Sequence, residues 1–209
     1  MMNHITKLKD KLFSVSNKTE PQTTKPWATI KQVQDEKIYK FDLSSEIDAN
    51  EVVNLIYKFR ENVPYSNEGK TNVFAWHSNF DTHKKTSDFD SLIKIMQDKL
   101  SLIGPTHNWP WYEVTYPILE SWAGIYKKTE FTVPHTHEPV NYAAVYYAKA
   151  NRNCSPIVFK TLNKDLEIVP TTGTLLIFSG RANHYVPRSI LDDERIMFAA
   201  NFLISFNKK

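Results

Sequence analysis

The sequence predicts an α+β fold that is mainly β, in which two helices brace a C-terminal β-sandwich or barrel. Apolar residues recur at helical spacing in two segments before residue 105, and after residue 111 short β-rich runs alternate with turn residues. Regularly spaced short strands are typical of sandwiches and barrels. Because the helices precede the strands, we expect a single domain over residues 27–209, with 27–111 as supporting strands and helices and 112–207 as the β core.

The composition fits a globular chain and excludes several classes of protein. Of the 209 residues, 41% are hydrophobic and 23% are charged, which argues against global disorder. The net charge is +3 and only five of the 26 basic residues are arginines, so nucleic acid is not an expected partner. The single cysteine, Cys154, excludes a disulfide framework and fits a reducing cytoplasm. Since no apolar run reaches the length of a signal-peptide core or a membrane span, we expect a cytoplasmic protein without a membrane partner.

The N-terminal part of the chain changes character at Trp27. Residues 1–26 are expected to form a polar arm, because residues 14–26 are polar and contain two prolines. After Trp27, the apolar residues predict two short strands on either side of a polar turn at 35–36.

Two helices are expected before the β core. Asp48 is a candidate N-cap for the first, whose apolar positions are Val52, Leu55, Ile56 and Phe59. The second is expected to start near Ser87, with Asp90 three residues later as the acid of a capping box and an end at 104–105. Both apolar stripes are interpreted as faces that pack on a sheet.

The expected β runs follow from the alternation of β-branched, aromatic and turn residues. They cover residues 112–120, 121–126, 142–148, 157–161, 166–169, 174–178 and 196–205.

Three histidines form the strongest chemical pattern. His135 and His137 are two positions apart, so in an extended chain their side chains point to the same face. His184 lies 49 residues beyond His135, directly after an apolar run. Three ligands with open coordination positions are typical of a catalytic metal site rather than a closed structural one. His77 and His83 lie outside this pattern and are expected to be exposed loop residues.

Arg195 stands at the start of the last long apolar run. A buried arginine needs an anionic partner, because an unpaired charge is costly to remove from water. Two partners are open: a structural salt bridge to one of the acids at 192–194, or the carboxylate of a substrate or cofactor held bidentately. We favour the second because a candidate metal histidine precedes it.

Several residues occur in an order that is also found in a known family. These are Tyr126, His135, His137, the run 145–147, the run 173–178, His184 and Arg195. The order resembles the 2-oxoglutarate- and Fe(II)-dependent oxygenases, in the prolyl-hydroxylase-like branch that includes oxygenases of tailed phages. The resemblance covers residues 121–206, with a looser match at 72–78. It implies a double-stranded β-helix, a jelly-roll or cupin-like barrel, braced by N-terminal helices.

The resemblance also implies roles for individual residues and cofactors. His135 and His184 would be metal ligands, Arg195 would bind the distal carboxylate of 2-oxoglutarate, and Tyr147 would hydrogen-bond the same carboxylate. Tyr126 matches a tyrosine that lines the cosubstrate pocket. The implied cofactors are Fe(II), 2-oxoglutarate and O2. We add Asn201 to the cosubstrate-binding set, because it lies six residues after Arg195 and thus on the same strand face.

His137 departs from the family, which most often has an aspartate or glutamate at this position. His137 could complete a three-histidine site, Glu138 could replace it through a local kink, or the position could be left to water or an anion. We rank the first highest, because in a regular strand Glu138 faces away.

The leading functional hypothesis is a dioxygenase that hydroxylates an amino-acid side chain, of prolyl type, or a small molecule, with release of succinate and CO2. The unidentified primary substrate is a peptide, a protein or a small molecule, and a homodimer is left open. One rival is a three-histidine, cupin-like metal dioxygenase or isomerase that does not use 2-oxoglutarate. The other is a non-catalytic jelly-roll binding module.

Overall fold

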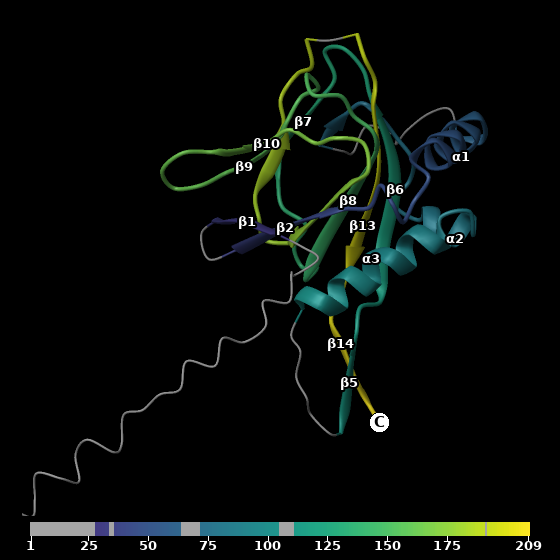
Figure 1. Ribbon diagram of the computed structural model, residues 1–209, viewed down its shortest axis with the longest axis vertical. Helices are drawn as coiled ribbons and strands as arrows, with labels where there is room; N and C mark the ends of the chain where they lie inside the picture. Colours follow the sequence, from purple (N-terminus) through teal and green to yellow (C-terminus); the bar gives the residue numbers. More distant parts are fainter. Residues whose placement is uncertain (1–27, 34–35, 64–71, 105–110, 191) are drawn as a thin grey trace, which may run out of the picture.

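The computed structural model describes residues 28–33, 36–63, 72–104, 111–190 and 192–209, with side chains from Lys37 onward (Figure 1). The predicted arm at 1–26 and Asp35 of the predicted turn at 35–36 lie outside the described residues, whereas Glu36 begins a strand. No helix in the described part of the chain is long and apolar enough to cross a membrane.

Two antiparallel sheets form the body of the protein, and together they make the expected jelly-roll barrel. The larger sheet has the strand order β1-β2-β11-β8-β13-β6-β4, and the smaller has the order β10-β9-β12-β7-β3. The larger sheet contains β1 (Ala28–Val33), β2 (Glu36–Asp42), β4 (Trp76–His77), β6 (Ile118–Tyr126), β8 (Tyr142–Lys149), β11 (Thr174–Ser179) and β13 (Arg195–Phe202). The smaller contains β3 (Val73–Phe74), β7 (Phe131–His135), β9 (Ile157–Phe159), β10 (Leu166–Ile168) and β12 (His184–Val186). Strands from the supporting region 27–111 therefore join both sheets.

The helices cover the outer face of the larger sheet, as Figure 1 shows. They are α1 (Ala49–Asn62), the short α2 (Thr82–Lys85) and α3 (Asp90–Ile103). The side chain of Asp48 accepts hydrogen bonds from the backbone of Asn50 and Glu51, so the predicted N-cap of α1 is confirmed. The second helix begins at Asp90 rather than near Ser87, and no side chain caps it, so the predicted capping box is wrong. The Ser87 carbonyl oxygen accepts from the Asp90 amide instead.

Strand β13 separates two apolar cores. Ile196, Phe198, Ala200 and Phe202 face the helices, whereas Met197 and Ala199 face the space between the two sheets. Because side chains alternate across a strand, a strand covered on both faces must be apolar throughout, which explains the unbroken apolar run. Arg195 and Asn201, at the two ends of β13, are the polar exceptions, and both are buried.

Two of the expected β runs are split. The predicted runs at 112–120 and 196–205 each contain a break, at Tyr116–Pro117 and at 203–204. The segment before the first break, β5 (Tyr112–Thr115), pairs with the segment after the second, β14 (Ser205–Lys208). They form a two-stranded ribbon that extends away from the barrel (Figure 1). The short strands β3, β4, β7 and β12 were not among the predicted runs.

Candidate active site

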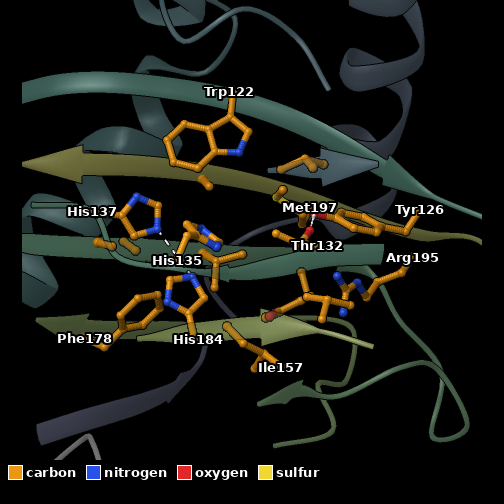
Figure 2. A pocket seen from close by; sticks show the side chains of 17 residues that line it. Trp122, Tyr126, Thr132, His135, His137, Ile157, Phe178, His184, Arg195 and Met197 are labelled. Carbon is orange, nitrogen blue, oxygen red and sulfur yellow. Dashed lines mark hydrogen bonds between the residues drawn. The ribbon is translucent and has the colours of Figure 1, made fainter. Parts of the chain in front are cut away.

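The three histidines of the sequence pattern come together at one end of the barrel interior (Figure 2). His135 ends β7 and His184 begins β12, and the two residues are direct partners across the antiparallel ladder. His137 follows β7 in a turn, where its amide donates a 2.7 Å hydrogen bond to the carbonyl oxygen of Gly180. One nitrogen from each ring lies within 4.8 Å of the others. This is a cluster that could hold one metal ion.

The turn that carries His137 depends on a glycine. A Cβ atom at Gly180 would lie 2.2 Å from the carbonyl oxygen of Val140, far inside van der Waals contact. Only glycine allows the β11–β12 connection to approach the turn this closely. Gly180 thereby sets the position of His137 relative to the other two rings.

The protonation state of the cluster suits metal binding. Nδ1 of His135 lies 2.9 Å from the Val133 carbonyl oxygen, and Nδ1 of His184 lies 2.9 Å from the Ala182 carbonyl oxygen. A carbonyl oxygen only accepts, so Nδ1 carries the proton in a neutral ring and Nε2 keeps its lone pair for a ligand bond.

The electrostatic environment keeps the three rings neutral. Burial lowers the pKa of His135, and burial together with the neighbouring His135 lowers the pKa of His137 to about 3. Burial, His135 and His137 lower the pKa of His184 well below its usual range. At neutral pH all three rings are therefore available as ligands.

Aromatic side chains hold the rings in place. The Trp122 ring stacks on His137 with centroids 5.8 Å apart, and Phe178 contacts His184 edge-on at 4.8 Å. Side chains fixed by packing give a site of defined geometry before any ligand arrives.

Glu138 does not join the cluster. Its carboxylate lies 3.6 Å from the Arg181 guanidinium, and both side chains are exposed. The kink that would let Glu138 replace His137 is thus not formed, and His137 takes the position in the cluster.

Arg195 lies at the opposite end of the same cavity (Figure 2). It is only 4% exposed, its Nη1 donates to the Ser155 carbonyl oxygen at 2.9 Å, and its buried Nε has no hydrogen-bond partner. Its guanidinium packs over the rings of Tyr126 and Tyr147, at 4.3 and 5.8 Å. A buried cation with free donors is prepared to receive an anion.

The acids next to Arg195 are paired elsewhere, so the salt bridge that the sequence left open is not formed. Within the described residues, the carboxylates at 192, 193 and 194 lie 3.1 to 3.6 Å from lysine side chains. These lysines are Lys128, Lys149 and Lys127. The described acids leave the guanidinium to whatever enters the cavity.

Two tyrosines line the cavity close to Arg195. The Tyr126 hydroxyl forms a 2.7 Å hydrogen bond with that of Thr132, and Tyr147 is almost fully buried. Burial raises the pKa of both phenols, with the Arg195 charge opposing the shift. Both therefore remain protonated and can donate hydrogen bonds to an anion.

The cavity between these two ends is mostly apolar. Its volume is about 60 Å³, and its walls include Val145, Ile157 and Met197 in addition to the polar ends. Apolar walls with a few convergent polar groups are typical of small-molecule sites. A dicarboxylate-sized ligand with one end at the histidines and one at Arg195 fits this distribution of charge.

Asn201 lies on the same face of β13 as Arg195, as the even spacing predicts, but it opens onto a different hollow. This second hollow, the outer cleft, has a volume of about 240 Å³ and also borders His135, His137 and Trp122. Asn201 donates through Nδ2 to the Glu120 carboxylate at 2.8 Å. The cosubstrate role assigned to Asn201 remains a prediction, and Asn201 does not line the cavity that holds Arg195.

The expectation that His77 and His83 are exposed loop residues is wrong. His77 lies on β4, is completely buried, and hydrogen-bonds through Nδ1 to the Ser78 carbonyl oxygen at 2.7 Å. His83 lies in α2, is partly buried, and contacts the Ser121 hydroxyl. The pairing of β4 with β6 buries His77, and a pairing at this distance in sequence leaves no local signal.

Sequence reasoning missed Trp122 and Glu120 as site residues. Both lie on β6 at even spacing from Tyr126, which had been assigned to the pocket. The two-residue period of a strand is the signal that would have found them.

Comparison with known proteins gives a fold. No protein-family model matches the sequence, and no curated protein matches it. Solved structures do match, and several of them are prolyl hydroxylases. The resemblance seen in the sequence is confirmed at the level of fold: the chain has the double-stranded β-helix of these oxygenases.

Three of the similar structures show the extent of the similarity. A Trichoplax adhaerens prolyl hydroxylase, in complex with a peptide of hypoxia inducible factor, has a TM-score of 0.60 at 17% identity, covering 86% of this chain and 84% of that one. A Pseudomonas putida prolyl-4-hydroxylase has a TM-score of 0.54 at 18% identity, covering 75% and 88%. A viral collagen prolyl hydroxylase from Paramecium Bursaria Chlorella virus-1, in complex with 2-oxoglutarate, has a TM-score of 0.55 at 14% identity, covering 79% and 94%.

Proposed function

We propose that this protein is a 2-oxoglutarate- and Fe(II)-dependent dioxygenase that hydroxylates a primary substrate. The observation that carries the proposal is the polarity of the cavity: three neutral imidazoles at one end and a buried, carboxylate-free guanidinium at the other. The similarity to prolyl hydroxylases, one of them holding 2-oxoglutarate, supports the same reaction class.

The residues present fit the iron. His135, His137 and His184 would hold it through one nitrogen each, which leaves coordination positions open for a cosubstrate. Fe(II) in such a site supplies the redox chemistry by which 2-oxoglutarate, O2 and a substrate C–H group become succinate, CO2 and a hydroxylated product.

The other side chains bind and orient the cosubstrate. Arg195 would bind its distal carboxylate through two N–H donors, and the protonated hydroxyls of Tyr147 and Tyr126 would add hydrogen bonds or fix the guanidinium. The apolar walls exclude water from the space between the two ends, which strengthens these interactions.

The test uses the purified full chain with Fe(II) added under anaerobic conditions. We expect one iron per chain, 2-oxoglutarate binding, and succinate release once O2 is admitted. His184→Ala should lose the iron, whereas the matched variant His83→Gln, outside the cluster, should keep it. Iron retained by His184→Ala at the wild-type level would contradict the ligand assignment.

A second candidate is supported by His137. A third imidazole in place of a carboxylate makes a cupin-like dioxygenase or isomerase that does not use 2-oxoglutarate a specific rival, with Arg195 bound to the substrate's own carboxylate. Full iron loading without any affinity for 2-oxoglutarate would favour this rival over the first proposal. Absence of both would leave a non-catalytic binding module.

A further inference from the structure

The outer cleft contains an acceptor that no group in the described part of the chain satisfies. Asn201 is 2% exposed, and its Oδ1 is buried without a hydrogen-bond partner. A carboxylate only accepts, so the 2.8 Å contact with Glu120 fixes the amide NH2 group toward Glu120 and leaves Oδ1 as the free acceptor. Unsatisfied buried acceptors are costly, and in a site they mark where a ligand donates.

Glu120 adds a negative charge to the same place. It is the direct cross-strand partner of Asn201, it is half-buried, and no described lysine or arginine lies within ion-pair distance of it. The Glu120 charge acts on the imidazole of His83, but burial lowers the pKa of that ring, so it is neutral at pH 7. No described cation therefore pairs with the carboxylate, which is open to a ligand.

An apolar side of the cleft leads from Glu120 to the histidines, while Asn72, Thr136 and Glu138, whose carboxylate lies 3.6 Å from the Arg181 guanidinium, also border the cleft. Phe80 is 37% exposed and Leu119 is 41% exposed, and both border the cleft. Phe80 meets Trp122 edge-on at 5.1 Å, and Trp122 stacks on His137. Glu120 lies two residues before Trp122 on β6, about 7 Å along the strand. The apolar part of a ligand thus has a path from Glu120 and Asn201 to the histidine cluster.

We propose that the outer cleft selects a primary substrate whose side chain carries an ammonium or guanidinium group, which donates hydrogen bonds to the Glu120 carboxylate and to Oδ1 of Asn201. The aliphatic part of the substrate then lies along Phe80 and Leu119 and presents a C–H group to the metal cluster. This rests on the proposed function, since the cleft is interpreted as the entrance to that reaction site.

The test measures binding and turnover separately. Binding is measured by calorimetry on the full chain loaded with Zn(II), which needs no turnover, and turnover by substrate-stimulated succinate release with Fe(II) and 2-oxoglutarate. The ligands are L-lysine and L-arginine, their neutral counterparts norleucine and citrulline, which keep the α-ammonium group but have uncharged side chains, and short peptides with a central lysine, free or Nε-acetylated. The free amino acids and the peptides distinguish the two sources of the cationic group.

We expect at least one cationic ligand to bind and to stimulate succinate release at least tenfold more than its neutral counterpart. Glu120→Gln should reduce this preference at least tenfold, and Glu120→Lys should transfer it to L-glutamate. The matched control Glu113→Gln, on the exposed ribbon strand β5, should bind as the wild type does. Melting temperature and iron content of each variant show whether the fold is kept.

The proposal is overturned if neutral and cationic ligands behave alike, if none of them binds, or if Glu120→Gln keeps the full preference. Failure of the proposed function looks different, because it would abolish succinate release while the cationic preference in calorimetry persisted.

Discussion

Replacing Arg195 by methionine should remove 2-oxoglutarate binding without weakening the fold. The guanidinium uses Nη1 for Ser155 and has no described carboxylate partner, so it can offer two parallel donors to a ligand carboxylate. Charge-assisted hydrogen bonds contribute about 1.5–3 kcal/mol each. Loss of two such bonds costs at least about 3 kcal/mol, which raises the Kd about 150-fold.

The same substitution should not lower the stability of the ligand-free protein. The Arg195→Met variant loses the hydrogen bond to Ser155 and the contact with Tyr126, which contribute about 1 kcal/mol each. It also removes a buried cation without a counter-charge, a cost of several kcal/mol to the wild-type protein. We therefore expect the ligand-free variant to unfold at the same or a higher temperature than the wild type.

Anaerobic calorimetry with Fe(II)-loaded protein measures the Kd, and thermal unfolding with and without 2-oxoglutarate measures the linkage. At 100 times the Kd the wild type should gain about 2.7 kcal/mol from the ligand, and the variant should gain almost nothing at the same concentration. Arg152→Met, at an exposed arginine, is the matched control. A wild-type Kd in Arg195→Met, or a ligand-free variant destabilised by several kcal/mol, would refute the reasoning and make Arg195 a structural residue.

Three other predictions concern stability and site geometry. Tyr146→Phe removes a buried hydroxyl without a described partner and should raise the free energy of unfolding by about 1 kcal/mol in urea titrations. Burial raises the pKa of Tyr146 to about 12, so the stability of the wild type should fall as the pH rises from 10 to 12. The same titrations at each pH should show a smaller fall in the variant. Gly180→Ala should displace the turn of His137 and weaken iron binding about tenfold or more in a chelator competition, and unchanged affinity would disprove the role of this contact. Asp48→Ala removes the cap of α1 and should cost about 1 kcal/mol in the same urea titrations, and a smaller loss than in an exposed Asp88→Ala control would contradict it.

The elements with a strong local signal were predictable from the sequence. The apolar spacing and the cap residue located α1, and the run after 195 located β13, because burial on one or both faces imposes a pattern on consecutive residues. The strand β7 was missed because its sequence, FTVPH, contains a proline and is only partly buried. The break between β5 and β6 was missed although Pro117 stands at it, and the partner of β5, the strand β14, is distant in sequence.

In the candidate site, too, some features follow from local sequence and others depend on distant strand pairing. The cluster of His135, His137 and His184 followed from spacing and resemblance, since two strands that end at one rim bring such residues together. The pairing of Glu120 with Asn201 depends on the register between β6 and β13, which a single sequence does not contain. The burial of His77 has the same origin, because β4 joins the edge of the larger sheet by pairing with β6, a strand distant in sequence.

The strand that separates the two cores gives an engineer two independent sets of positions. Arg195, Met197 and Ala199 of β13 face the cavity that ends at the three histidines, and the even-numbered residues support the helices, for example through the stack of Phe198 on Phe89 at 4.5 Å. Substitutions at Met197 or Ala199 should therefore reshape which molecules the cavity accepts while the helical layer keeps the sheet in place. Stabilising changes can be sought at the alternate positions, so that catalyst and scaffold can be altered separately on one strand.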